Sequence, residues 1–241
     1  MLIQRAKEKL IELVKESDLM EREIEISCKT LTKEEAIGNP LHDDYPLAIG
    51  KEKIIEARLL GKRSQAFSDS YFNYNGKIKD LLELDLNSNA RRAIFISSLN
   101  VILSVLGLIQ EPVHCKNDDL LKCADHFSKF IKSKFKNQKK ALLIGLQPRL
   151  LSVLADLKQV RVCDKDPDNI GTQIRGIRID GPEKWQEHAK WADFVIATGS
   201  TIVNNTIDDI YNTDPDTFFF GVTITGVAYL LGLNQFCYVM E

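Results

Sequence analysis

The chain has 241 residues, a formal net charge of −2 at pH 7, and 44% hydrophobic against 27% charged residues. These values are typical of a soluble globular protein and exclude an acidic solvating tail. Neither half of the chain is strongly basic. The positive surface with which proteins bind phosphate backbones is therefore missing, and we expect no nucleic-acid partner.

The N-terminus and the cysteines bear on the compartment. The first residues carry a charge every two or three positions, so no apolar signal segment is predicted. The longest apolar stretch, residues 93–109, is interrupted by serines and an asparagine and is too short and polar to span a bilayer. Five scattered cysteines in a chain that can fold without disulfides favour a reducing compartment. We expect a cytoplasmic protein with no membrane partner.

The first 137 residues show strand patterns first and helix patterns afterwards. Alternating apolar residues predict half-buried strands, and apolar residues three or four apart predict amphipathic helices. The predicted elements are a helix over 2–16, a strand over 23–29, a hairpin over 53–67 that turns at Gly61, a loop that ends at Gly76, a helix from about Ser88 to Leu106, and a helix over 120–135. This order predicts an α+β N-terminal domain over residues 1–137.

From about residue 139, strands alternate with helices. We predict strands over 140–146, 160–164, 174–179, 193–199, 217–223 and 235–240, and helices over 148–157, 182–191, 201–211 and 225–232. Such alternation requires right-handed crossovers and a mainly parallel, doubly wound sheet. The predicted fold class is therefore α/β, with this second domain over 138–241, and the Lys-rich segment 133–140 joins the two.

Open α/β sheets bind ligands beyond the carboxyl ends of their strands. The turns that follow the first two strands of this sheet are therefore candidate ligand-binding segments. Gly145 and Gln147 form the first turn, which has one glycine and therefore lacks the dinucleotide fingerprint, and Pro148 removes an N–H donor. Asp164 ends the next strand, where an acidic residue would meet a ribose hydroxyl. An aspartate at a strand end is also a common turn former, so both interpretations stay open.

Two later strand ends carry hydroxyls, glycines and an amide. The candidate ligand-binding residues there are Thr198, Gly199, Ser200, Thr201, Asn204, Thr223, Thr225 and Gly226. A hydroxyl that caps the following helix explains Ser200 or Thr201 alone, and the free N–H groups of the first turn can bind an anion. Capping does not explain as well why Asn204 and Asn205, which have poor helix propensity, lie in the first turns of the predicted helix. We predict recognition of a polar or anionic small molecule here.

His114, Cys115 and Lys116 form a second constellation, with Cys123 further along. Imidazole and thiolate are ligands of zinc and other transition metals, so His114 and Cys115 are candidate metal ligands and Lys116 a candidate ligand-binding residue. No C-x-x-C motif occurs, and adjacent side chains of an extended segment point apart. Cys123 shares an apolar helix face, where cysteine usually packs as a small hydrophobe.

Two further features favour structural interpretations. His188 lies on a polar and aromatic helix pattern, and we expect it at the surface. Asp43 and Asp44 could bind a cation, but they lie in a turn-rich loop where acidic residues are common.

Taken in chain order, several motifs resemble one family. They are Ser64–Asp69, Arg91–Asn100, His114–Lys116 with Cys123, Ile144–Pro148, Asp164–Gly171, Thr198–Thr201 with Asn204, and Gly221–Gly226. Together they are similar to the uncharacterised prokaryotic proteins described as putative heavy-metal chelation domain proteins. The similarity runs from about Gly50 to the end of the chain.

The resemblance implies an enolase N-terminal-like domain followed by a Rossmann-like domain. It also implies a role in heavy-metal chelation or in the metabolism of a metal cofactor or siderophore, with a transition metal ion as the expected cofactor. It places the pocket at the domain junction, between residues 114–116 and the polar turns at 198–204 and 223–226. A homo-oligomer is compatible with all of this.

Two hypotheses follow from the sequence. In the first, the protein binds a small polar or anionic ligand of metal metabolism in the crevice between the domains. In the second, the Rossmann-like domain is an enzyme or binding module for a nucleotide-like or carboxylate ligand, with Asp164 on a ribose. A purely structural protein would leave the polar strand-end turns unexplained. The sequence does not decide whether the protein is an enzyme.

Overall fold

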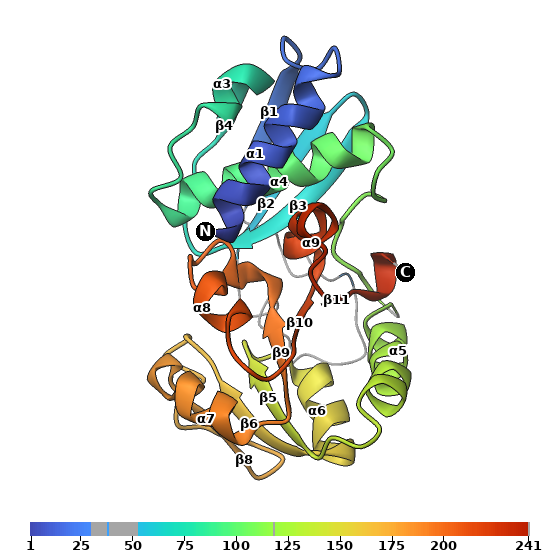
Figure 1. Ribbon diagram of the computed structural model, residues 1–241, viewed down its shortest axis with the longest axis vertical. Helices are drawn as coiled ribbons and strands as arrows, with labels where there is room; N and C mark the ends of the chain where they lie inside the picture. The colour runs from blue at the N-terminus through green and yellow to red at the C-terminus, as the bar shows by residue number, and fades with distance from the viewer. Residues whose placement is uncertain (30–37, 39–52, 118, 241) are drawn as a thin grey trace.

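The computed structural model describes residues 1–29, 38, 53–117 and 119–240. Two sheets organise this part of the chain (Figure 1). One has four strands in the order β3-β2-β1-β4, and the other has seven in the order β11-β10-β9-β5-β6-β8-β7. The fold is therefore mixed α/β, as predicted. The acidic pair Asp43-Asp44 lies outside the described residues.

The four-stranded sheet is antiparallel throughout, and α1 and α4 lie against it. The elements of this part are α1 (Leu2–Lys15), β1 (Glu23–Lys29), β2 (Lys53–Leu59), β3 (Lys62–Ser68), β4 (Tyr74–Lys77), α3 (Ile78–Leu82), α4 (Asn89–Val105) and α5 (Asp119–Lys134). The predicted helices, strand and hairpin are confirmed. Ser88 begins α4 as predicted, because its side chain accepts a hydrogen bond from the Arg91 N–H group.

The predicted loop before Gly76 is wrong at its end. Residues Tyr74–Lys77 form β4, and Gly76 pairs with Ile24 of β1. A four-residue strand that contains Asn and Gly has low β propensity, so pairing with β1 rather than local sequence makes it a strand.

The seven-stranded sheet is parallel except for the pairing of β7 with β8. Its strands are β5 (Lys140–Ile144), β6 (Gln159–Cys163), β7 (Gln173–Ile174), β8 (Ile177–Asp180), β9 (Phe194–Thr198), β10 (Thr217–Phe220) and β11 (Gln235–Phe236). The helices are α6 (Pro148–Leu157), α7 (Trp185–Trp191), α8 (Ile207–Tyr211) and α9 (Thr225–Leu231), with the 3-10 turns η2 (Pro182–Lys184), η3 (Gly199–Thr201), η4 (Val222–Ile224) and η5 (Tyr238–Met240).

Several predicted elements are shorter or divided. The strand at 174–179 is a hairpin, because Arg175 and Gly176 adopt positive φ angles of 55° and 77°. The helix at 201–211 is reduced to α8, because Asn205 has a φ of 61°, which a helix does not accept. The strand at 235–240 ends at Phe236 and continues as a 3-10 turn.

Side chains of the central parallel strands alternate between two apolar cores. Leu143 and Ile196 point into a core that α5 and α6 cover, whereas Leu142 and Val195 belong to the core on the opposite face. Residues buried on both faces are typical of parallel strands, which explains their continuous apolar sequences.

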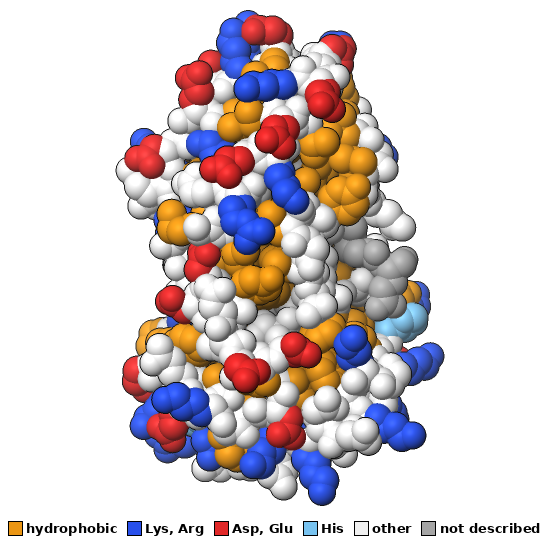
Figure 2. Space-filling model, in the orientation of Figure 1, with side chains coloured by type: hydrophobic (Ala, Val, Ile, Leu, Met, Phe, Trp, Pro, Cys, Tyr) orange, Lys and Arg blue, Asp and Glu red, His pale blue; other side chains and the backbone are white. Residues whose placement is uncertain are grey.

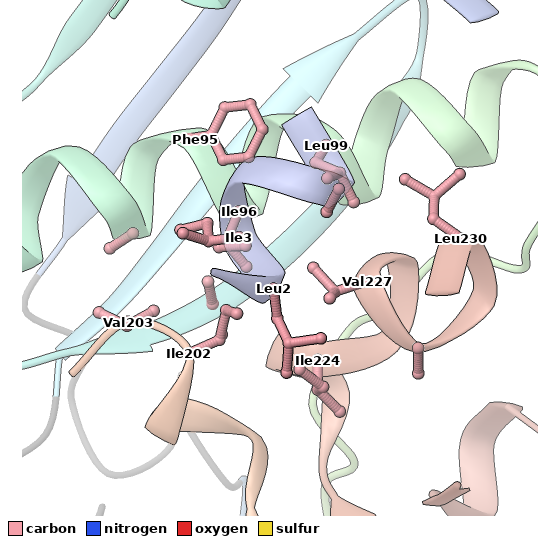
Figure 3. Close-up of a cluster of buried hydrophobic side chains, with 14 of the residues drawn as sticks. Leu2, Ile3, Phe95, Ile96, Leu99, Ile202, Val203, Ile224, Val227 and Leu230 are labelled. Carbon is pink, nitrogen blue, oxygen red and sulfur yellow. The ribbon is translucent and has the colours of Figure 1, made fainter. Parts of the chain in front are cut away.

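The second of these cores extends from the parallel sheet into the antiparallel part. Figure 3 shows Leu2 and Ile3 of α1, Phe95 and Leu99 of α4, and Val227 of α9 in one cluster. The N-terminus is also bound to the C-terminal part, since the Leu2 N–H group donates to Asp208 Oδ1 at 2.7 Å. Apolar burial of this kind holds the two sheets in a fixed relation.

The drawn surface carries acidic and basic side chains intermingled over both parts (Figure 2). Among the described residues, no helix combines the length and the apolar character that crossing a membrane requires.

Candidate functional site

The strand order reverses at β5, so the crevice between the ends of β5 and β9 is where an α/β sheet would bind a ligand. Gly145 follows β5 with a φ of 85°. A Cβ atom at this position would lie 2.6 Å from Thr198 Cγ2. The glycine therefore lets the Thr198 side chain lie against the backbone of this turn.

Asp164 and Gln147 are engaged in local hydrogen bonds. Asp164 Oδ2 accepts from the Leu146 N–H group at 2.6 Å, and Oδ1 accepts from the Asp166 N–H group at 2.7 Å. Gln147 Oε1 caps α6 by accepting from the Leu150 N–H group at 2.6 Å. These contacts favour the turn-forming interpretation of Asp164, and its contact with a ribose stays a prediction.

The turn after β9 is also ordered by its own side chains. Thr198 Oγ1 lies 3.0 Å from Ser200 Oγ, and the Thr201 hydroxyl donates to the Thr198 carbonyl at 2.8 Å. Gly199 has no room for a side chain, since a Cβ atom there would be 2.9 Å from Ile224 Cβ. Asn204 follows this turn, and its side chain accepts hydrogen bonds from other segments of the chain.

The turn after β10 is bound to the antiparallel part. Thr223 Oγ1 accepts from the Phe67 N–H group of β3 at 3.1 Å. The Gly226 N–H group donates to Asn100 Oδ1 of α4 at 2.8 Å, and Thr225 Oγ1 accepts from Gln235 Nε2 at 2.9 Å. Thr223, Thr225 and Gly226 are buried. The bonds of Thr223 to Phe67 and of Gly226 to Asn100 therefore connect the two sheets from within the protein.

A polar cluster with exposed atoms lies at the same junction. We define the junction cluster as Asp69, Asn89, Lys165 and Asn204. Lys165 Nζ donates to Asp69 Oδ2 at 3.0 Å and to Asn204 Oδ1 at 2.9 Å. Asn89 Nδ2 donates to both oxygens of Asp69, at 3.0 and 3.1 Å. Four separate segments therefore contribute to it: those after β3, β6 and η3, and the start of α4.

Arg92 holds one side of the junction cluster in place. This buried guanidinium donates to the Val203 carbonyl at 2.6 Å and to the Leu86 carbonyl at 2.9 Å, and it also binds Asn89 Oδ1. Burial lowers the pKa of Arg92, and the nearby Asp69 carboxylate partly opposes this shift. Since Arg92 reaches the residue before Asn204, it fixes two members of the cluster at once.

The pKa of Asp69 reflects two opposing effects. Burial by itself raises it, but hydrogen bonds from Asn89 and Lys165 and the charge of Lys165 lower it below its usual value. Asp69 is therefore ionised at neutral pH, and the junction cluster presents one carboxylate and one ammonium group side by side.

Sequence reasoning identified only Asn204 among these four residues. Asp69 lies in one of the segments on which the family resemblance was based, and Lys165 follows the candidate residue Asp164 directly. What was missing is the contact between segments that are far apart in the chain.

Comparison with known proteins addresses the family. Residues 130–223 match the model of the DUF364 family, described as "Putative heavy-metal chelation". The predicted family resemblance is confirmed. No curated protein matches the chain.

Two solved DUF364 structures share the fold. A protein of unknown function from Pyrococcus horikoshii is 17% identical, with a TM-score of 0.55 over 92% of this chain and 80% of that one. Another, from Desulfitobacterium hafniense, is 12% identical, with a TM-score of 0.53 over 95% and 84%. At these identities the likeness establishes the fold and nothing beyond it.

The DUF364 description directs attention to the predicted metal ligands, which have different neighbours. The His114 ring packs edge-on against Phe67, with ring centroids 5.3 Å apart, and the backbone N–H group of His114 donates to Gln65 Oε1 at 2.9 Å. Hydrogen bonding with Cys123 of α5 and burial raise the pKa of the Cys115 thiol. His114 and Cys115 as a shared ligand pair stay a prediction. The Lys116 carbonyl accepts a hydrogen bond from the Asp119 N–H group at 3.1 Å, in the turn that leads into α5.

No group of three or more His, Cys, Asp and Glu side chains in the described ranges is arranged to hold a metal ion. A zinc site of the usual kind needs at least three protein ligands, so these residues do not form one.

The expected exposure of His188 is wrong. Its side chain is buried, with Nε2 2.8 Å from Asp180 Oδ2 and Nδ1 3.1 Å from Arg161 Nη1. A guanidinium only donates, so Nδ1 is the acceptor and Nε2–H donates to Asp180. The imidazole is therefore held by both neighbours. These residues border an open pocket of about 410 Å³ on the outer side of β6 and β8, away from the junction cluster.

Proposed function

We propose that this protein binds a small anionic ligand that carries a metal ion, a metal chelate, at the junction cluster. The observation that supports this is the meeting of Lys165 and Asn204 from the parallel part with Asp69 and Asn89 from the antiparallel part. A metal chelate has both negatively charged donor groups and a cation. Lys165 suits the former and Asp69 the latter.

Accessibility supports the same proposal. The Lys165 side chain is 55% exposed and that of Asp69 48% exposed. A ligand can therefore reach both charges, and their mutual attraction in water costs little to give up. None of the four cluster residues is a histidine or cysteine, which favours binding over nucleophilic catalysis.

The finer fold assignment belongs to this proposal. The parallel strands run β8-β6-β5-β9-β10-β11, which in order of appearance is 3-2-1-4-5-6, the order of Rossmann folds. We propose a Rossmann-like domain over 138–241 and an enolase N-terminal-like domain over 1–137, with the ligand between them. A cytoplasmic location and a homo-oligomeric state are further parts of this proposal.

The test is a thermal-shift and calorimetric comparison of citrate, Ni²⁺ and Ni²⁺–citrate against the full chain. We expect Ni²⁺–citrate to stabilise the wild type more than either component does. Lys165→Met and Asp69→Asn should each lose this effect. Arg175→Met is the matched control, because Arg175 and Asp156 form a similarly exposed ion pair at 2.6 Å away from the cluster. Equal responses in Lys165→Met and Arg175→Met would refute the proposal.

ADP is included in the same screen. Stabilisation by ADP that disappears in Asp164→Ala would favour a nucleotide-like ligand instead. We expect no such effect, because Thr198 lies against Gly145 and the Asp164 carboxylate is already hydrogen-bonded.

A further inference from the structure

We propose that the pocket between α7 and the strands β6 and β8 binds a small zwitterion, an α-amino acid, through Arg161 and Asp180. None of the residues that line this pocket belongs to the junction cluster. Binding here is therefore independent of binding at the junction cluster, and it involves no metal ion.

The pocket exists because β6 and β8 come together only at their ends. The two strands pair in parallel through the last two residues of each. The residues that precede these pairs, 160–161 and 176–178, line the pocket, and α7 adds Glu187 and His188. Its volume of about 410 Å³ is sufficient for a small molecule, since such sites occupy about 300–1,000 Å³.

The imidazole of His188 connects a cation and an anion of the pocket lining. Its Nδ1 accepts from Arg161 Nη1 at 3.1 Å, and its Nε2–H donates to Asp180 Oδ2 at 2.8 Å. The His188 residue is only 5% exposed, so the packing around it restricts rotation of the ring. One positive and one negative group are thereby held on opposite sides of one ring, as recognition of a zwitterion requires.

Arg161 retains donors for a carboxylate. Its bond to His188 and its 4.0 Å ion pair with Glu187 both involve Nη1. In the described part of the chain, no hydrogen bond occupies Nε or Nη2 of this residue. The guanidinium carbon lies 4.4 Å from the centre of the Trp191 ring, which supports the group from one side. A guanidinium held in this way can donate two parallel hydrogen bonds to a carboxylate.

Asp180 and Glu187 supply the negative charge that an ammonium group needs. Asp180 accepts from His188 through one oxygen and from Arg178 Nε, at 3.3 Å, through the other. A carboxylate has about four lone-pair sites, so Asp180 can accept further hydrogen bonds. The charged residues of the lining are two arginines and two acidic residues, whose formal charges cancel. This balance favours a ligand that carries both charges over a simple anion or cation.

The experiment compares an amino acid with its two singly charged analogues. Each proteinogenic L-amino acid is added to the full chain and examined by ligand-observed NMR, and the strongest binder is titrated by calorimetry. The carboxylic acid that lacks its amino group and the amine that lacks its carboxylate are titrated in the same way. We expect each analogue to bind at least about tenfold more weakly, because it loses the charge-assisted hydrogen bonds of one group.

This comparison uses the wild type alone and does not depend on the folding of a variant. Absence of binding by every amino acid would overturn the proposal. Equal affinity for the carboxylic acid analogue would also overturn it, because the pocket would then be a simple anion site.

Variants assign the binding to this pocket. Arg161→Lys and Asp180→Asn should each weaken binding at least about tenfold, because lysine lacks the planar fork and asparagine lacks the charge. Arg175→Met is the matched control, since Arg175 lies in the turn between β7 and β8 but outside the pocket lining. It should bind like the wild type, as should Lys165→Met. Wild-type affinity in both Arg161→Lys and Asp180→Asn would overturn the proposal, and so would an equal loss in Lys165→Met.

Discussion

Two of the sets of polar contacts between the antiparallel and the parallel parts differ in their access to water. The first surrounds Asn100, a fully buried residue of α4 that donates to the Val222 and Thr223 carbonyls at 3.2 and 3.3 Å and accepts from the Gly226 N–H group. The second is the junction cluster, whose charged side chains are about half exposed. Polar contacts at a junction can therefore be structural or available to a ligand, and burial distinguishes the two.

The largest effect on stability is expected at Gly226. A Cβ atom there would lie 2.3 Å from Leu99 Cδ2 and 2.6 Å from Asn100 Oδ1. Neither neighbour can move easily, because Leu99 is buried and Asn100 is held by hydrogen bonds. Gly226→Val should lower the free energy of unfolding by about 3 kcal/mol, at the upper end for overpacking, as measured by urea denaturation. A loss below that of a typical surface substitution would show that α4 and α9 are not closely packed.

Asn100→Leu should have the second-largest effect on stability. The substitution leaves the Gly226 N–H group and two carbonyls without their buried partner, which costs about 2 kcal/mol. Denaturation midpoints give the comparison. An unchanged midpoint would mean that water replaces the side chain, and the contact would then resemble the junction cluster.

Asp164→Ala should have a smaller effect of about 1 kcal/mol, because the hydrogen bonds it removes are only partly buried. The expected change is in stability alone, with Ni²⁺–citrate binding retained. A loss of ligand binding with stability unchanged would assign Asp164 to the site.

The smallest effect on stability is expected from Lys165→Met. Exposed ion pairs contribute about 0–1 kcal/mol, so the melting temperature should hardly change while the affinity for Ni²⁺–citrate falls at least about tenfold. Asn100→Leu should therefore mainly lower stability, whereas Lys165→Met should mainly weaken ligand binding. A Lys165→Met variant as unstable as Asn100→Leu would make the junction cluster a structural contact.

The pH dependence of the junction cluster can be derived from Asp69. Its pKa is lowered on folding, so its contribution to stability is present above the unfolded pKa of about 3.9 and is lost as pH falls through the lower folded value. In Asp69→Asn, stability should no longer show the decrease that Asp69 causes as pH falls. Near neutral pH, the substitution should change stability no more than Lys165→Met does. Denaturation midpoints at pH 7 and at decreasing acidic pH would show it.

Most elements could be predicted from the sequence because their signals are local. The apolar runs of β5 and β9 and the Ser88 cap of α4 are visible within a few residues. The failures are also local in origin: Arg175, Gly176 and Asn205 adopt positive φ angles that hydrophobic periodicity does not reveal.

The candidate sites were harder to predict because they depend on contacts between distant segments. Nothing near Asp69 in the chain indicates that Lys165 will bind it. Conversely, the hydroxyls at 198–201 and 223–225 appeared to be ligand groups, but much of their hydrogen bonding holds the fold together. The sequence predicted a polar region at the junction but did not identify which side chains there stay accessible.

Calorimetric titration of Ni²⁺–citrate into the wild type, Lys165→Met and Arg175→Met tests the central claim most directly. The account predicts saturable binding to the wild type and to Arg175→Met, and at least an approximately tenfold weaker affinity for Lys165→Met, equivalent to about 1.4 kcal/mol. Absence of binding to the wild type, or the same affinity in all three proteins, would contradict it.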